Sequence, residues 1–209
     1  MDAGPEELDA VDRQVIRLFA MVAEAIARAT SALLGDDVRL AGTVVAQDEE
    51  IDELVANTER LVWDRFAGLP VAPADWRYLV MVLLVLPELE RSADLAEHVA
   101  QRALNGLGGE MSPISRGVVQ RMAESAIEMW RTVADSYADR RSVLESLMED
   151  DDEIDVLHDR LTREVASEAM AVPVSAQVTL VARFYERLGD HAVNLARRVA
   201  HLPAAASLG

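Results

Sequence analysis

The sequence predicts an all-α protein, built from two tandem three-helix bundles (six helices) that are related by an internal repeat. Three observations lead to this fold class. Apolar residues recur at helical spacing along almost the whole chain, and the alternation typical of strands is not visible. The composition is dominated by Ala, Leu, Glu and Arg, side chains that lose little rotamer freedom on a helix. The two halves of the chain also match each other, with a glycine-rich stretch between them.

In the first half, the apolar spacing predicts three helices, which cover residues 7–34, 37–67 and 75–104. Gly35 is expected to end the first helix, because glycine is favoured at a helix C-terminus. Asp37 is then placed to cap the second helix. A turn rich in glycine and proline, at residues 68–73, separates the second helix from the third. Pro87, inside the third helix, should kink it or free a backbone carbonyl.

The best linker in the chain is residues 105–113, which hold three glycines and one proline without a periodic apolar pattern. It is predicted to join a first bundle, residues 1–104, to a second, residues 114–209. The second bundle again has three predicted helices, at residues 114–138, 140–169 and 174–201. Because an amphipathic helix needs neighbours to cover its apolar face, three helices make the smallest bundle. The two bundles could pack end to end or side by side.

The internal repeat can be followed in two pairs of segments. EEIDELVANTERLV, which starts at Glu49, is similar to DEIDVLHDRLTREV, which starts at Asp152. ELERSADLAEHVAQRAL is similar to FYERLGDHAVNLARRVA, so that Glu90 aligns with Glu186. Each half therefore reads as helix, helix, turn and helix.

Composition excludes several classes of site and partner. The chain has no cysteine, which excludes disulfides, thiolate metal ligands and cysteine nucleophiles. Its net charge of −17 repels nucleic-acid phosphates, so we expect no nucleic-acid binding. The N-terminus is acidic without an apolar leader, and the longest apolar run, residues 79–87, is too short to span a bilayer. We therefore expect a cytoplasmic protein that does not insert into a membrane.

Paired carboxylates are the strongest functional signal. Each half carries two acidic pairs spaced four residues apart: Asp48 and Asp52, Glu90 and Asp94, Asp151 and Asp155, Glu186 and Asp190. One such pair alone is most simply a solvated helix face, with a mild repulsion between its charges. Counted from the turn of each antiparallel hairpin, however, every acid meets its counterpart at nearly the same height. Four carboxylates at one height suit a hard or borderline cation such as Mg, Mn, Fe or Zn.

The remaining polar and aromatic residues form no catalytic arrangement. No glycine-rich phosphate loop and no Ser/His/Asp set is visible, so we predict that the protein is not an enzyme. The four histidines do not cluster, although His98, one turn after Asp94, could join the first acidic set. The three tryptophans are interpreted as packing anchors rather than a binding box: Trp63, Trp76 and Trp130.

With these motifs assembled, the sequence resembles the PhoU family over residues 8–202. The segment ERLGDHAVNLARRV, residues 186–199, is similar to the family signature ERIGDHAVNIAE, and ELERSAD is similar to it in the first half. The family also has a proline-containing segment before helix three and a helix-two segment, which PVAPADWRYL and DDVRLAGTVVAQDEEIDEL resemble. The motifs occur in the family's order.

The resemblance implies metal, often iron or zinc clusters, held at the E/D-x-x-x-D motifs by the eight acids named above. It also implies a cytoplasmic regulator that restrains phosphate uptake and phosphate-starvation signalling. The implied partners are the ATPase subunit of a phosphate ABC transporter and a phosphate-sensing histidine kinase, with a homodimer as the assembly. Ala93 replaces the glycine of the signature in the first half, so we expect lower metal occupancy there.

Two other readings remain open at this point. A metal-free helical interaction scaffold would explain the same amphipathic pattern without any cation. A ferritin-like di-metal protein would need Glu-x-x-His motifs on facing helices. The chain has no such motif, since Asp155 and His158 have the spacing but not the glutamate.

Overall fold

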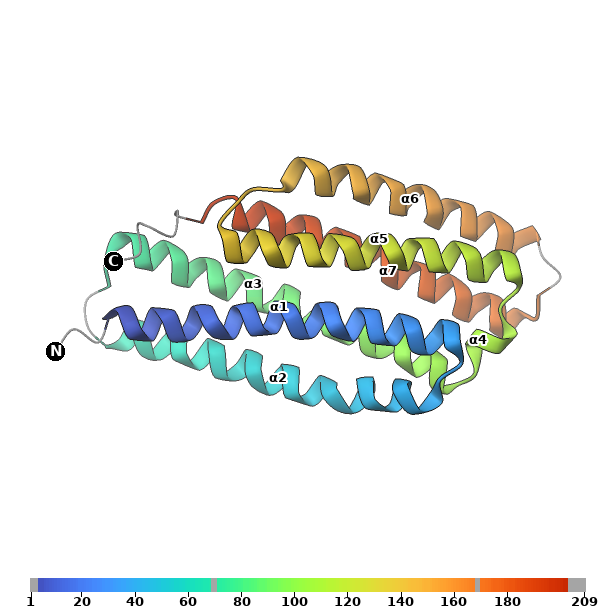
Figure 1. Ribbon diagram of the computed structural model, residues 1–209, viewed down its shortest axis with the longest axis horizontal. Coiled ribbons are helices and arrows are strands. Elements are labelled where there is room, and N and C mark those ends of the chain that lie inside the picture. The colour runs from blue at the N-terminus through green and yellow to red at the C-terminus, as the bar shows by residue number, and fades with distance from the viewer. Residues whose placement is uncertain (1–3, 69–70, 168–169, 203–209) are drawn as a thin grey trace.

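The computed structural model describes residues 4–68, 71–167 and 170–202, and over these residues the chain is helical without any strand (Figure 1). The six long helices are α1 (Gly4–Gly35), α2 (Val38–Ala67), α3 (Pro73–Leu104), α5 (Pro113–Asp139), α6 (Leu144–Ser167) and α7 (Val172–Val199). The predicted all-α class, with two repeated three-helix bundles, is confirmed. One short helix, α4 (Leu107–Glu110), lies inside the predicted linker; the division into two domains at that linker stays a prediction.

Local signals account for most helix ends. The Asp37 side chain caps α2 as predicted, with Oδ1 accepting from the Leu40 amide at 2.9 Å. Gly35 is the last residue of α1, but the left-handed residue that follows is Asp36, with φ of 54°. Prolines occupy the first turns of α3, α5 and α7, where the missing N–H costs no helical hydrogen bond. α3 continues through Pro87, so the Leu83 carbonyl loses its usual donor.

The two bundles pack side by side along their lengths. α1 contacts α5, and α3 contacts α7, while α2 and α6 lie on the opposite outer edges (Figure 1). The core is continuous across this contact, and its largest wholly buried side chains include Phe19, Tyr78, Trp130, Tyr137 and Tyr185. The sequence left open whether the bundles pack end to end or side by side. The contacts of α1 with α5 and of α3 with α7 show that they pack side by side.

Directional bonds also join the bundles. Asp12 of α1 accepts hydrogen bonds from the hydroxyls of Tyr78 and Tyr137, both at 2.9 Å, and pairs with Arg140. The Arg140 guanidinium also lies over the Tyr137 ring, 4.4 Å from its centroid. Further along the contact, Thr30 bonds to the Tyr185 hydroxyl at 2.7 Å. These buried bonds fix the register of one bundle against the other.

The central helix α1 is the one described helix long and apolar enough, by length and composition, to cross a membrane, over Leu8–Gly35. Its apolar residues face the protein core instead: Val15, Leu18 and Val22 are wholly buried. The apolar composition of α1 is therefore explained by its place in the middle of the two bundles.

Candidate functional site

The α2–α3 hairpin brings the four predicted acids of the first half into one electrostatic cluster. Asp48 is half-buried, and its pKa is raised to about 6, mainly by burial. Repulsion from the carboxylates of Asp52, Glu97, Asp94 and Glu90 contributes the rest of this rise, in that order. Glu97 was not among the predicted residues; it lies three positions after Asp94 on the same helix. The predicted heights of the acids are thus close enough for their charges to interact.

The α6–α7 hairpin repeats this arrangement with the acids of the second half. The pKa of Asp151 is raised to about 6, mainly by burial and then by repulsion from Asp190, Asp155, Glu186 and Asp152, in that order. Asp152 is the additional acid here. It follows a predicted ligand directly, so the i, i+4 spacing gave no reason to include it.

Gly189 gives the second cluster its shape. A Cβ atom built on Gly189 would lie 2.5 Å from Asp151 Oδ1 and 3.2 Å from Ile154 Cδ1. The missing side chain therefore leaves the space into which the Asp151 carboxylate fits. The repeat places Ala93 at the corresponding position of α3, where its Cβ is buried. The first cluster therefore lacks the space that Gly189 provides in the second.

Glu186 contributes an unpaired oxygen to the second cluster. Its Oε1 pairs with Arg183, one turn earlier on α7. Its Oε2 is buried and has no hydrogen-bond partner among the described residues. An oxygen in this state is a ready acceptor for a cation, because leaving a buried acceptor unsatisfied is costly.

Carboxylate oxygens are suitable ligands for a hard cation, but the side chains of the two clusters are not arranged around a cation site. Among the described residues, no three His, Asp or Glu side chains converge closely enough to hold a metal ion as they stand. Several of the acids are exposed and free to change rotamer: Asp52, Asp155 and Asp190. A cation at either cluster would therefore need side-chain rotation, and the ligand role of the eight acids stays a prediction.

The histidines take structural positions near the clusters. His191 is buried and bonds through Nδ1 to Ser92 Oγ at 2.9 Å; burial is the main cause of its lowered pKa. His98 stacks on Phe184, with ring centroids 5.5 Å apart. His98 thus packs between α3 and α7, and nothing in its contacts directs it to the first cluster.

The tryptophan interpretation was correct for one residue and wrong for two. Trp130 is wholly buried, and its Nε1 donates to the Leu188 carbonyl at 3.0 Å. Trp63 and Trp76 are 53% and 52% exposed. Both lie on the α2–α3 hairpin, and α2 is an edge helix that packs against α1 and α3 (Figure 1). Its outer side is therefore not covered by the second bundle.

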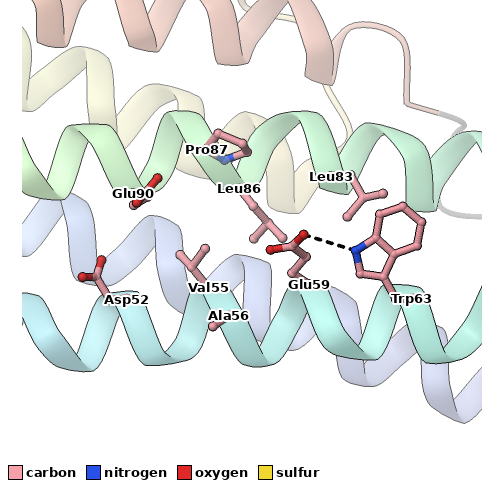
Figure 2. A pocket seen from close by; sticks show the side chains of 9 residues that line it. All are labelled: Asp52, Val55, Ala56, Glu59, Trp63, Leu83, Leu86, Pro87 and Glu90. Atoms are coloured by element: carbon pink, nitrogen blue, oxygen red, sulfur yellow. Dashed lines mark hydrogen bonds between the residues drawn. The ribbon is translucent and has the colours of Figure 1, made fainter.

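A groove of about 500 Å³ extends the first cluster along the α2–α3 hairpin (Figure 2). Its lining from α2 is Asp52, Val55, Ala56, Glu59 and Trp63. Its lining from α3 is Leu83, Leu86, Pro87 and Glu90. One end of the groove holds two predicted cation ligands, and the other end holds an exposed indole.

A second groove, of about 520 Å³, lies between α3 and α7 and has the opposite charge. Its polar lining includes Arg77, Arg197, Arg198 and His201, with Leu84 among the apolar residues. No acid among the described residues lines it, although the whole chain carries a charge of −17. This groove depends on both repeats, since α3 supplies one side of it and α7, with His201 just after it, supplies the other.

Comparisons with known proteins agree with the repeat. The family model of the PhoU domain matches the chain twice, at residues 15–103 and 119–199. A relative from Aquifex aeolicus, named a phosphate-specific transport system accessory protein PhoU homolog, is 32% identical over 188 residues, covering 87% of this chain and 84% of its own. A Mycobacterium tuberculosis relative, PhoU homolog 2, is 30% identical over 200 residues and 93% of each chain.

Two solved structures are similar over nearly the whole chain. The crystal structure of PhoU from Pseudomonas aeruginosa has a TM-score of 0.88 and 25% identity, and the match covers 94% of this chain and 97% of that one. The phosphate transport system regulatory protein PhoU from Streptococcus pneumoniae has a TM-score of 0.81 at 19% identity, covering 94% of each chain. The second likeness concerns the fold alone.

The close contact at Gly189 predicts that alanine at this position destabilises the fold, whereas alanine in place of glycine inside a helix usually stabilises it. Gly189→Ala should lower the free energy of unfolding by about 1–3 kcal/mol, because the new methyl group displaces the Asp151 carboxylate. The matched control, Gly117→Ala on α5, has open space around it and should stabilise by about 0.5–1 kcal/mol through helix propensity. Urea unfolding measures both. Equal, stabilising effects of the two substitutions would contradict the close approach of Asp151.

The raised pKa of Asp151 predicts a pH-dependent effect of Asp151→Asn. In metal-free protein the folded state holds the Asp151 proton up to about pH 6, whereas the unfolded chain loses it near 3.8. Ionisation therefore destabilises the fold as pH rises from 4 to 6, and the penalty is complete above 6. Asp151→Asn should raise the melting temperature by about 2–4 °C at pH 7 and by much less at pH 4.

The exposed acid Asp159, also on α6, provides the control for this comparison. Asp159→Asn should leave the pH dependence of the melting temperature unchanged. If Asp151→Asn lowered the melting temperature at pH 7, or shifted it equally at both pH values, burial and repulsion of the Asp151 charge would not destabilise the fold.

Proposed function

The chain belongs to the PhoU family, and we propose that it is a cytoplasmic regulator of phosphate uptake and phosphate-starvation signalling. The observation that carries this proposal is the double match of the PhoU domain model, at residues 15–103 and 119–199. The curated relatives support it, because their names describe accessory proteins of a phosphate-specific transport system. Accessory proteins act by binding, so the proposed role is recognition and not catalysis.

The proposed partners are the ATPase subunit of a phosphate ABC transporter and a phosphate-sensing histidine kinase. The word accessory in the relatives' names supports a partner in the transport machinery. A homodimer is proposed on the family resemblance. The acidic groove between α2 and α3 and the basic groove between α3 and α7 have opposite charges, which would let one chain bind partners of different charge.

Cation binding is the second part of the proposal. The residues that would hold the ions are Asp48, Asp52, Glu90 and Asp94 in the first half, and Asp151, Asp155, Glu186 and Asp190 in the second. Fe, Zn, Mn or Mg would supply positive charge that neutralises the repulsion between these carboxylates. The second cluster fits better, because Gly189 makes room for Asp151 and Glu186 brings a buried oxygen without a hydrogen-bond partner.

A metal-free interaction scaffold is the alternative that one observation favours. No three potential donors converge among the described residues, and a scaffold would need no convergence. The raised pKa values would then reflect only crowding of acids on two hairpins. Both versions share the regulatory role and differ in whether a cation is part of the folded protein.

Deleting the gene tests the regulatory role. We expect phosphate-starvation genes, followed with a promoter reporter, to be expressed in phosphate-rich medium once the restraint is removed. Reintroducing the wild-type gene should restore repression and serves as the control. Reporter expression that is unchanged by the deletion in both rich and poor phosphate would contradict a role in phosphate regulation.

A further inference from the structure

The α2–α3 hairpin carries an exposed aromatic cluster on an acidic protein. Trp63 and Trp76 are about half exposed, and Phe66 lies between them, with ring centroids 5.8 Å from Trp63 and 4.8 Å from Trp76. Large aromatic side chains left in water forgo the free energy of burial. Tryptophan is also enriched among the residues that dominate protein interfaces. This cluster therefore has the properties of a docking surface.

The groove beside the cluster is apolar at its centre and acidic along its length. Figure 2 shows Val55 of α2 and Leu86 of α3 in the middle of the groove, with Asp52 and Glu90 at one end and Leu83 beside Trp63 at the other. Glu59 lies between them and accepts a hydrogen bond from Trp63 Nε1 at 3.1 Å. That bond holds the indole ring beside the groove, so that its face is available to a ligand.

The polar groups of the groove are nearly all acceptors. Among the described residues, three carboxylates line it, from Asp52, Glu59 and Glu90, and no Arg or His does. The indole N–H of Trp63, which also belongs to this described lining, is already bonded to Glu59. Pro87 adds a further acceptor, because it leaves the Leu83 carbonyl without its usual donor. A complementary ligand must bring positive charge, hydrogen-bond donors and apolar surface together.

The second repeat shows which cation satisfies such a carboxylate. Glu90 corresponds to Glu186, and Pro87 corresponds to Arg183. Arg183 pairs with Glu186 from one turn away on α7. In the first repeat, a proline replaces this arginine. Trp63 of the first repeat likewise lies at the position that corresponds to Ala166 of the second. Arg91, which follows Glu90, and Arg183 both line a cavity between α3 and α7, and the charge of Arg91 partly offsets the raised pKa of Glu90. What the first repeat lacks is the ion pair with an arginine one turn earlier that Glu186 has in the second.

We propose that this groove binds an arginine-containing amphipathic segment of a protein partner. One guanidinium lies against the Trp63 face and donates to Glu59, a second donates to Glu90 at the other end of the groove, and apolar side chains of the segment cover Leu83 and Leu86. Arginine suits this position because it stacks on aromatic rings and donates to carboxylates in a planar fork. The inference deepens the proposed regulatory function by naming a partner-binding surface. Because Glu90 is also a predicted cation ligand, the segment and a metal ion would compete at the first cluster.

The test uses the full chain, in a buffer with chelator, and a synthetic helical peptide with Arg and Leu side by side on one face. Affinity is measured by isothermal titration calorimetry. Trp63→Ala should weaken binding at least about tenfold, and Glu59→Gln about threefold. Two matched controls should leave the affinity unchanged: Leu180→Ala, which truncates an exposed apolar residue of α7, and Glu149→Gln, which removes one exposed charge of α6.

The controls separate the groove from general attraction of a basic peptide to an acidic protein. Trp63→Ala changes no charge, and because the residue is exposed the fold should survive, as a melting curve will verify. Failure of the peptide to bind wild type at millimolar concentration would overturn the proposal. Equal affinities of wild type, Trp63→Ala and Glu59→Gln would do the same. Neither result bears on the deletion phenotype, so the regulatory role and the groove can fail separately.

Discussion

The antiparallel packing of α2 on α3, and of α6 on α7, is the constraint on which the other features depend. Ile51 and Ile154 are wholly buried, and each lies between two predicted ligands on its helix, Asp48 and Asp52 or Asp151 and Asp155. The buried isoleucine holds the helix face in place, so the carboxylates cannot separate by rotation of the backbone. Core packing therefore keeps the carboxylates partly buried and close together, and the raised pKa values of Asp48 and Asp151 follow first from that burial and then from the repulsion.

The two repeats share this constraint but have diverged in what surrounds it. The second repeat has Gly189 beside Asp151 and Arg183 beside Glu186, which makes a compact, partly neutralised cluster. The first repeat has Ala93 and Pro87 at those positions, and its acids adjoin a groove that Trp63 lines. One hairpin is thus better suited to a cation and the other to a protein segment. Side-by-side packing of the bundles joins both surfaces through one continuous core.

Features that depend on one helix or one hairpin were predictable from the sequence. The helices, the Asp37 cap and the common height of the acids all follow from spacing and local chemistry. Features that depend on tertiary packing were not. The basic groove joins Arg77 to Arg197 across the two repeats, and no sequence spacing relates them. The exposure of Trp63 follows from the edge position of α2, and Glu97 and Asp152 join the clusters through geometry that the i, i+4 rule does not cover.

The central claim, that core packing holds carboxylates together where a cation can neutralise them, is tested most directly by thermal unfolding of metal-stripped protein. Melting curves are recorded with chelator and with added Mg, Mn, Fe or Zn. At least one metal should raise the melting temperature, by about 5–10 °C at a free concentration hundredfold above its Kd. Glu186→Gln should reduce this shift. A melting temperature that is unchanged by chelator and by all four metals would contradict the claim. The protein would then be a metal-free scaffold.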